Sequence, residues 1–311
     1  LATRGSPLAL HQTELVAAAL RAAHAGPAGL AVEVVVVRTR GDADTSASLD
    51  QIGGQGVFVT EVEAAVEEGR ADAAVHSAKD MTSVMADDLV LAAVLPRADP
   101  RDGLVGTALA DLPAGALIAT GSARRRAQLA SLRPDLVFTE VRGNMARRVA
   151  VGESGEVSAV VVAVAAMERL GWADRLADVL DPADVLPQAG QGAIAVQCRA
   201  GDDATLALLG AIDHEPSHRA LRAERAVLAA VGGSCTVPVG AFAEMLGDGG
   251  PGGRGGRGSG AALRVQGLLA SADGHTLIRM TREGEDPEAV GVGVATALLE
   301  GGGRAIEGFA G

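Results

Sequence analysis

A short, mostly apolar run ends abruptly in side chains suited to acid–base chemistry. The run occupies residues 71–80, and the side chains at its end are His76, Ser77, Lys79 and Asp80. Such a run predicts a buried strand that delivers its chemistry at the carboxyl end, where open α/β sheets place their ligands. The alternative interpretation is a solvated loop with an incidental ion pair.

Lys79 is distinctive because it is the only lysine among the 311 residues, whereas arginine is common. The lysine ammonium is compact and strongly hydrated, and the planar guanidinium of arginine differs from it in reach and hydration. We therefore expect position 79 to be one where arginine does not substitute.

Arginines recur where predicted strands turn into helices. Strands are predicted at 117–119, 137–141 and 157–164, and a helix follows each. Cations in the first turn of a helix oppose its macrodipole, so the arginines that open the helix at 123–132 indicate an anionic ligand. A solvated run of charge is the alternative. The arginines that would form this carboxylate- or phosphate-binding rim are Arg124, Arg125, Arg126, Arg142, Arg147, Arg148 and Arg169.

The first hundred residues predict a β-α-β-α-β order with parallel strands and right-handed crossovers. Ser6 as N-cap, followed by Pro7, begins the first helix. With Arg4 beside it, this helix start would bind an anion, whereas without the arginine plain capping would be the preferred interpretation. A polar and then Gly-rich segment precedes the second helix and is predicted to be a mobile lid. The predicted elements are strands at 1–3, 31–37 and 89–95, helices from 7 and over 57–68, and the lid at 43–56.

Two turn-rich segments, at 96–102 and 187–192, predict crossings between two α/β lobes, which is the organisation of a hinged ligand trap. The expected fold is α/β, with two hinged periplasmic-binding-protein-like domains and a small C-terminal α+β domain. A strand at 193–198 is predicted to return to the first domain. The third region predicts helices at 217–231 and 286–299, strands at 237–244, 262–269 and 275–281, and a Gly-rich loop at 247–260. The predicted domains are 1–97 with 190–212, then 98–189, and finally 213–311.

Composition excludes several classes of function. The net charge of −12 argues against general binding to nucleic acids or membrane surfaces, which need a basic face. Two cysteines, Cys198 and Cys235, cannot form a disulfide framework, and neither a secretory segment nor a membrane span is evident. We therefore expect a cytoplasmic protein, and no metal site is predicted.

Six stretches, in the same order and spacing, are similar to the porphobilinogen deaminase family, also called the hydroxymethylbilane synthases. Each stretch is weak alone, but together they are specific and cover essentially the whole chain. They are Thr3–Leu10, Gly53–Val59, Val75–Asp80, Arg142–Asn144, Gly190–Ala193 and Gly233–Pro238.

The resemblance implies a transferase of tetrapyrrole biosynthesis. It would condense four porphobilinogen molecules head to tail on a dipyrromethane primer, release ammonia and yield hydroxymethylbilane. Cys235 would carry this cofactor through a thioether, although a cysteine of this kind also suits a small buried position. Asp80 would be the catalytic carboxylate. The family also suggests a monomer.

The resemblance implies two sets of binding residues for carboxylated pyrroles. The cofactor-binding set is Cys235, Lys79, Ser77, Asp42, Thr120, Ser122, Arg124, Arg125, Arg142, Gly143 and Gln191. The substrate-binding set is Arg4, Ser6, Arg148, Arg169 and Phe58.

Several residues depart from the family pattern, and two other functions compete with the transferase. Gln55 replaces a lysine of the lid, and Arg126 and Arg147 fall outside the shared set. A hinged small-anion-binding protein would have the same lobes and arginine rim, and an inactive paralogue would have the same fold.

Overall fold

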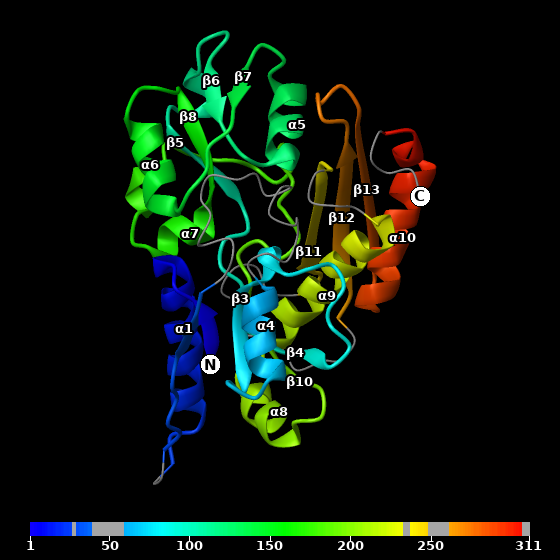
Figure 1. The fold of residues 1–311 in the computed structure, drawn as a ribbon. Coiled ribbons are helices and arrows are strands. Elements are labelled where there is room, and N and C mark those ends of the chain that lie inside the picture. Colours follow the sequence, from blue (N-terminus) through cyan, green and yellow to red (C-terminus); the bar gives the residue numbers. More distant parts are fainter. Residues whose placement is uncertain (27–28, 39–58, 233–236, 248–260, 307–311) are drawn as a thin grey trace.

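The computed structural model describes residues 1–26, 29–38, 59–232, 237–247 and 261–306, in which the strands form three sheets (Figure 1). The predicted lid lies outside these ranges, as does the predicted Gly-rich loop from residue 248. An α/β fold with a small C-terminal α+β unit is therefore confirmed.

The first sheet has the strand order β2-β1-β3-β10-β4. Strands β1, β2 and β3 are parallel, as predicted, whereas β10 runs antiparallel to both of its neighbours. Helix α1 packs on one face and α4 on the other, burying Val16 and Val62 respectively. The elements are β1 (Ala2–Arg4), α1 (Pro7–Ala23), β2 (Val35–Val37), α4 (Thr60–Glu67), β3 (Ala73–Ser77), the 3-10 turn η1 (Ala78–Asp80), β4 (Leu89–Val94), β10 (Ile194–Arg199) and α8 (Asp203–Gly210).

The strand predicted over 31–37 was wrong in its length and burial. Only Val35–Val37 form β2, because its sole described partner, β1, is three residues long. At this sheet edge Val36 is 54% exposed, whereas a strand buried on both faces was expected. The run of β-branched residues marks a strand but does not determine its place in the sheet.

The second sheet has the order β7-β6-β8-β5-β9. Its strand β5 begins at Asp102, within a segment predicted to be only a crossing, and lies antiparallel to β8 and β9. The residue pattern did not predict this strand, because glycines flank its short apolar centre. The elements are β5 (Asp102–Gly106), the 3-10 turn η2 (Leu109–Asp111), β6 (Leu117–Ala119), α5 (Ala123–Leu132), β7 (Val137–Thr139), α6 (Met145–Glu153), β8 (Ala159–Ala163), α7 (Val164–Arg169), the 3-10 turn η3 (Ala173–Arg175) and β9 (Asp178–Val179).

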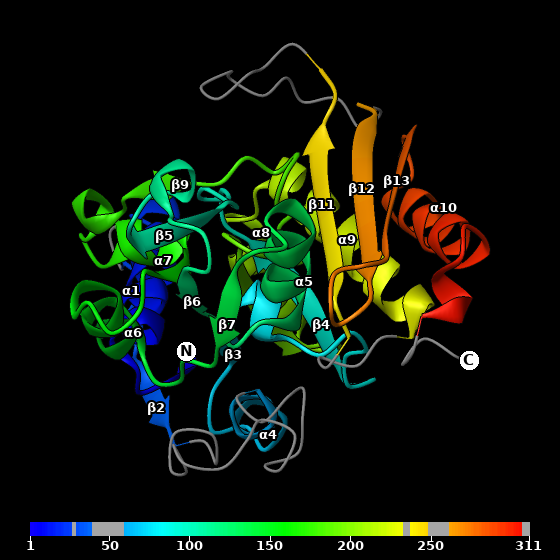
Figure 2. The same cartoon turned by 90° about the horizontal axis from the view of Figure 1, so that it is seen from above.

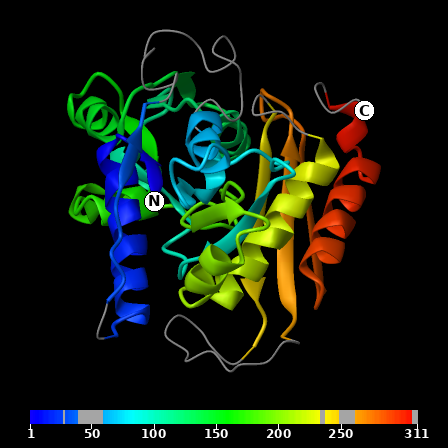
Figure 3. The same ribbon diagram turned by 60° about the horizontal axis from the view of Figure 1, so that its bottom comes forward.

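The C-terminal unit is a three-stranded antiparallel sheet with helices on one face (Figure 2). Val227 and Val294 of the two helices pack on that face, and Leu268 on the other face packs against Ala127 and Leu186 of the second region. Figure 3 shows α9 between the first and third sheets. The elements are α9 (Glu215–Val231), β11 (Val239–Met245), β12 (Leu263–Ala270), β13 (Leu277–Gly284), α10 (Pro287–Glu300) and the 3-10 turn η4 (Gly303–Ala305).

Glu224 lies on the buried face of α9. Its side chain is fully buried and accepts hydrogen bonds from Arg97 Nη1 at 2.5 Å and the backbone N–H groups of Gly190 and Ala243 at 2.6 and 2.7 Å. One carboxylate thus joins the first crossing, the second crossing and the C-terminal sheet.

Candidate active site

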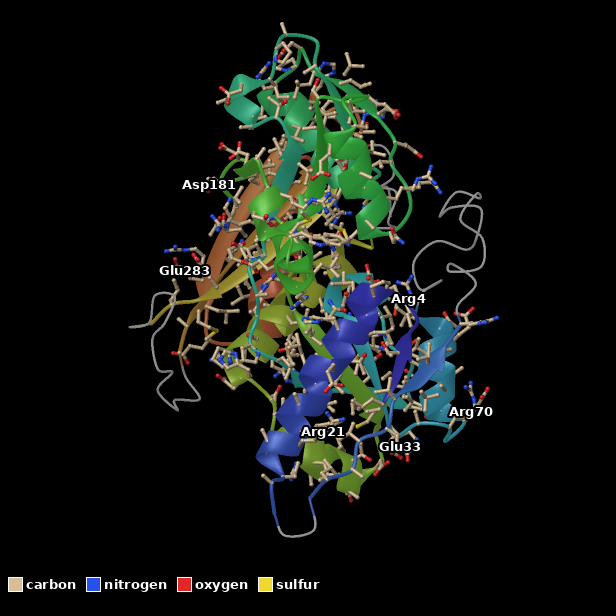
Figure 4. The ribbon with its side chains drawn as sticks, turned by 90° about the vertical axis from the view of Figure 1, so that its left-hand side faces the viewer. Arg4, Arg21, Glu33, Arg70, Asp181 and Glu283 are labelled. Carbon is tan, nitrogen blue, oxygen red and sulfur yellow. The ribbon has the colours of Figure 1, made fainter. Side chains whose placement is uncertain are left out.

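A cavity of about 60 Å³ lies where β3 ends beside the start of α1. Arg4 ends β1, the parallel neighbour of β3, so both strands present their carboxyl ends at one edge of the sheet. Figure 4 shows Arg4 at the end of α1 nearer the green elements of the second sheet, with Arg21 near the opposite end. The polar residues that line this cavity are Arg4, Ser6, Gln12, His76, Ser77 and Asp80.

The residues around the cavity are held by local hydrogen bonds. Ser6 Oγ accepts from Ala9 N at 3.2 Å, which confirms Ser6 as the N-cap of α1. Ser77 Oγ donates to Gln12 Oε1 at 2.9 Å, joining β3 to α1. Asp80 is exposed at the end of η1, so its carboxylate is accessible to a ligand.

Lys79 faces the second crossing, where Nζ donates to Gln191 Oε1 at 3.3 Å. Burial and, next, the charge of Arg125 lower the pKa of Lys79, whereas Asp80 and Asp102 raise it, and the net pKa is about 8. The ammonium form therefore still predominates at neutral pH, and it lies close to both cations and carboxylates.

Gln191 lies in the second crossing and is fully buried. Its Nε2 donates to the Pro100 carbonyl at 2.7 Å and to Asp102 Oδ1 at 2.8 Å. The neighbouring Gly190 has a φ of +74°, and a Cβ there would lie 2.9 Å from Lys79 N. Only glycine lets the second crossing pack this closely on η1.

Arg124 and Arg125 are buried and paired with Asp102. Arg124 Nη2 lies 2.8 Å from Oδ2, and Arg125 Nε and Nη2 lie 2.9 and 2.6 Å from Oδ1. These contacts hold the pKa of Asp102 well below its usual range. The anion inferred beside these arginines is thus supplied by the chain itself, and their contact with a cofactor stays a prediction.

Asp102 was missed as a site residue. The one available signal was an aspartate among prolines at the first crossing, which does not reveal a partner 22 or 89 residues away. Long-range pairing of this kind is decided by packing.

Three further predicted arginines lie in helices α6 and α7 or just before α6. Arg148 Nε donates to the Gly143 carbonyl at 3.0 Å, and Arg169 Nη2 donates to the Gly192 carbonyl at 2.7 Å. Burial lowers the pKa of Arg148, as does the charge of Arg125, whereas Asp80 raises it. Arg142 is half-buried and pairs with Glu140 at 3.3 Å. The charge of Arg148 therefore interacts with that of Asp80, the predicted catalytic carboxylate.

Thr120 and Ser122 position the start of α5. Ser122 N donates to Thr120 Oγ1 at 3.2 Å, and Ser122 Oγ accepts from Arg125 N at 3.4 Å as the N-cap. Arg126 is exposed and lies 6.0 Å from the ring centre of Phe138. The two hydroxyls therefore help to direct Arg125 inward while Arg126 packs on β7.

Gly143 permits a close turn ahead of α6. Its φ is +100°, and a Cβ there would lie 2.8 Å from Arg147 Cδ. The exposed Arg147 therefore lies along this turn.

His76 and Gln197 form a buried polar group that the sequence analysis did not identify as such. Burial lowers the pKa of His76 to about 4, while Gln197 opposes that shift. The His76 Nε2 atom and both amide atoms of Gln197 have no partner of good hydrogen-bond geometry among the described residues. His76 is therefore neutral within β3, the strand that leads into η1 and Asp80.

Four predicted residues lie outside the described ranges, namely Asp42, Gln55, Phe58 and Cys235. The other cysteine, Cys198, is buried in the core of the first sheet, where burial raises the pKa of its thiol. No group of three His, Cys, Asp or Glu side chains in the described part of the chain is placed to hold a metal ion. Within the same ranges, no helix has the length and apolar character needed to cross a membrane.

The donor set fits a ligand that carries several carboxylates. Lys79, Arg125 and Arg148 influence one another electrostatically next to Asp80, in a chain with a net charge of −12. Gathering cations at one place in an acidic protein is unfavourable unless anions offset them. Asp80 and Asp102 offset part of this charge, and a dipyrromethane with acidic side chains would supply further negative charge.

Comparison with solved structures finds limited similarity. The structure is similar to a YaeC-family lipoprotein from Enterococcus faecalis, with a TM-score of 0.39, 15% identity and coverage of 69% of this chain and 90% of the other. YhfZ from Shigella flexneri gives a TM-score of 0.36 at 18% identity, covering 72% and 92% of the two chains.

Comparison by sequence gives far stronger matches. Residues 1–207 match the family model "Porphobilinogen deaminase, dipyromethane cofactor binding domain", and residues 219–300 match "Porphobilinogen deaminase, C-terminal domain". Porphobilinogen deaminases from Roseiflexus sp. and Roseiflexus castenholzii are each 43% identical, over 98% of this chain and 97% of theirs. Two family models and near-complete relatives agree, and the chain belongs to the porphobilinogen deaminase family.

Proposed function

We propose that this chain condenses four porphobilinogen molecules on a dipyrromethane primer, with Asp80 as the carboxylate that transfers protons. Family membership supports the overall reaction, a transferase step of tetrapyrrole biosynthesis that yields hydroxymethylbilane. The observation that carries the assignment of Asp80 is its exposure at a sheet edge where Lys79, Arg125 and Arg148 gather.

Asp80 has three tasks in this proposal. The leaving amine of porphobilinogen needs a proton, the cation that remains needs a nearby negative charge, and the attacking pyrrole carbon must lose its proton. A single carboxylate at the edge of the cavity serves all three by alternating between its protonated and ionised forms.

The cationic groups hold carboxylates in this proposal. Lys79, Arg125 and Arg148 would bind the acidic side chains of the cofactor and of the growing chain. Arg4 and Ser6 would bind those of the incoming substrate. Bidentate guanidinium–carboxylate contacts fix orientation as well as position, and orientation is what a head-to-tail condensation requires. The cofactor itself, when bound, supplies a pyrrole with a free α-carbon as the primer.

The remaining assignments belong to the same proposal. Cys235 carries the cofactor through a thioether. The rest of the predicted cofactor-binding set completes that site, and Arg148, Arg169 and Phe58 join Arg4 and Ser6 in binding substrate. The predicted domain boundaries, a cytoplasmic location and a monomeric state are proposed with it. The low cysteine content supports a reducing compartment.

Intact mass under denaturing conditions tests the cofactor assignment. Protein from cells that make porphobilinogen should carry an adduct of two pyrrole units, which Cys235→Ala should lose. Cys198→Ala is the matched control and should keep the adduct, because Cys198 lies in the core of the first sheet. An unmodified and inactive unsubstituted protein would favour the anion-binding alternative, and an adduct without turnover would favour the inactive paralogue.

Ammonia release tests the role of Asp80. Asp80→Asn should lower turnover by about a thousandfold or more while the fold is retained. Asp72→Asn is the control, because Asp72 precedes the same strand and its side chain is 82% exposed at 3.9 Å from Arg199. Near-normal ammonia release by Asp80→Asn would refute the assignment.

A further inference from the structure

Asp102 lies at the point where four segments of the chain converge. It begins β5, is fully buried, and accepts hydrogen bonds from Arg124, Arg125 and Gln191 at 2.6 to 2.9 Å. These partners come from α5 and from the second crossing, whereas Asp102 itself follows the first crossing. Through Gln191 the network continues to Lys79 on η1.

We propose that Asp102 is a positioning residue for this reaction, holding Arg125 and Gln191 so that the Lys79 ammonium stays charged and is held by Gln191 next to Asp80. This inference deepens the proposed function and rests on it only for the role of Lys79 as a carboxylate-binding group. Neither the family match nor the relatives' names assign a role to Asp102.

The hydrogen-bond chemistry explains how Asp102 acts at a distance. An ionised carboxylate can only accept hydrogen bonds, so the amide NH₂ of Gln191 faces Asp102 and its Oε1 faces Lys79. The carbonyl groups of Pro100 and Arg101, at 2.7 and 3.2 Å, reinforce this orientation. Gln191 Oε1 then accepts from Lys79 at 3.3 Å and from Arg125 at 3.5 Å.

Charge gives the second part of the argument. Lys79, Arg124, Arg125 and Arg148 are four cations around the crossings, and each is at least partly buried. Asp102 is the buried carboxylate that contacts two of them directly, and its charge raises the pKa of Lys79. Without it, Arg125 would repel the ammonium with less compensation, and Lys79 would lose its proton more readily.

Glu224 offers a matched control. It is equally buried, pairs with Arg97 at 2.5 Å, and accepts the Gly190 N–H. Its connection to Gln191 runs through Arg97 Nε, which donates to the Gln191 backbone carbonyl at 2.9 Å, and it does not involve the side-chain amide that accepts from Lys79. A purely structural effect of a buried carboxylate should appear in both variants, whereas positioning of Lys79 should appear only with Asp102.

The single lysine makes the experiment specific. The full-length protein and its Asp102→Asn and Glu224→Gln variants are labelled with an amine-reactive reagent over a range of pH. Peptide mass spectrometry then reads the label at Lys79, and intact mass establishes that the proteins compared carry the same cofactor load. The pH midpoint is compared, because it depends on the pKa of Lys79 rather than on accessibility.

We expect Asp102→Asn to move the midpoint down by roughly one pH unit, a gain of about fivefold in labelling at pH 7. Glu224→Gln should leave the midpoint in place. Equal shifts in both variants, or no shift in Asp102→Asn, would overturn the inference.

Gln191→Leu keeps the test decisive if Asp102→Asn does not fold. It removes the bridging amide without removing a charge, so the midpoint should move in the same direction by a smaller amount. An unchanged midpoint would count against positioning through Gln191. If the midpoints are as predicted but the protein carries no adduct and shows no turnover, the proposed function is overturned. The positioning of Lys79 by Asp102 would still stand.

Discussion

Asp102 and Glu224 are two fully buried carboxylates paired with arginine at crossings between the sheets. Asp102 contacts two guanidinium groups and an amide that reaches Lys79. Glu224 contacts one guanidinium and two backbone N–H groups. Because their partners differ, Asp102 is assigned to positioning the site residues, whereas Glu224 joins the domains.

Burial alone therefore does not identify a functional carboxylate. Both carboxylates offset the cost of removing cations from water, and loss of either leaves groups without partners. Only the hydrogen-bond network of Asp102 continues through the Gln191 side chain to the Lys79 side chain. The comparison makes four predictions, which follow in order of decreasing effect.

Glu224→Ala should give the largest loss of stability. It leaves the buried Arg97 guanidinium and the N–H groups of Gly190 and Ala243 without this acceptor, at a cost of about 3–5 kcal/mol. Urea unfolding measures the effect. Glu288→Ala is the control, since its pair with Arg222 is half exposed and should contribute under about 1 kcal/mol. A comparable loss in both variants would contradict the role assigned to Glu224.

Asp102 should make stability depend on pH in the acid range. Its folded pKa lies below the ordinary value of 3.8, so its contribution is complete above that value. As pH falls further, the unfolded chain takes up the proton first, and the contribution disappears as pH passes through the folded pKa. The stability gap between the protein and Asp102→Asn should therefore shrink from pH 5 to pH 2 in urea titrations. A gap that stays constant over this range would contradict the depressed pKa.

Arg124 and Arg125 share Asp102 but should differ in their effect on turnover. Arg125 also reaches Gln191, whereas Arg124 donates to the Leu186 carbonyl at 2.5 Å. Arg125→Met should lower the rate of ammonia release by about tenfold more than Arg124→Met. If the two variants are equally active at matched cofactor load, Arg125 has no larger role in turnover than Arg124, and the prediction is wrong.

Lys79→Arg should have the smallest effect, because it retains the charge. The planar guanidinium is larger than the ammonium and does not fit the position from which Lys79 donates to Gln191 Oε1. We therefore expect turnover to fall by about threefold to tenfold. Arg70→Lys, at an exposed pair with Glu68, is the control and should leave turnover unchanged. Full activity of Lys79→Arg would refute the inference drawn from the single lysine.

The sequence was sufficient wherever the signal was local. Helix 123–132 was predicted with the bounds observed for α5, and Ser6 and Pro7 correctly marked the start of α1. The polar end of β3 was recognised because an apolar run and the residues after it are adjacent in the chain. Motif order then identified the family, since six short stretches in one order are specific together.

By itself, then, the sequence determined the α/β class, the parallel first strands, the strand end at Asp80 and the family. Only the tertiary structure decided the antiparallel direction of β10, the edge position of β2, the presence of β5 and the partners of Asp102 and Glu224. The physical reason is distance along the chain. Helix period and capping act within a few residues, whereas Asp102 and Glu224 find partners 89 and 127 residues away, which only packing brings together.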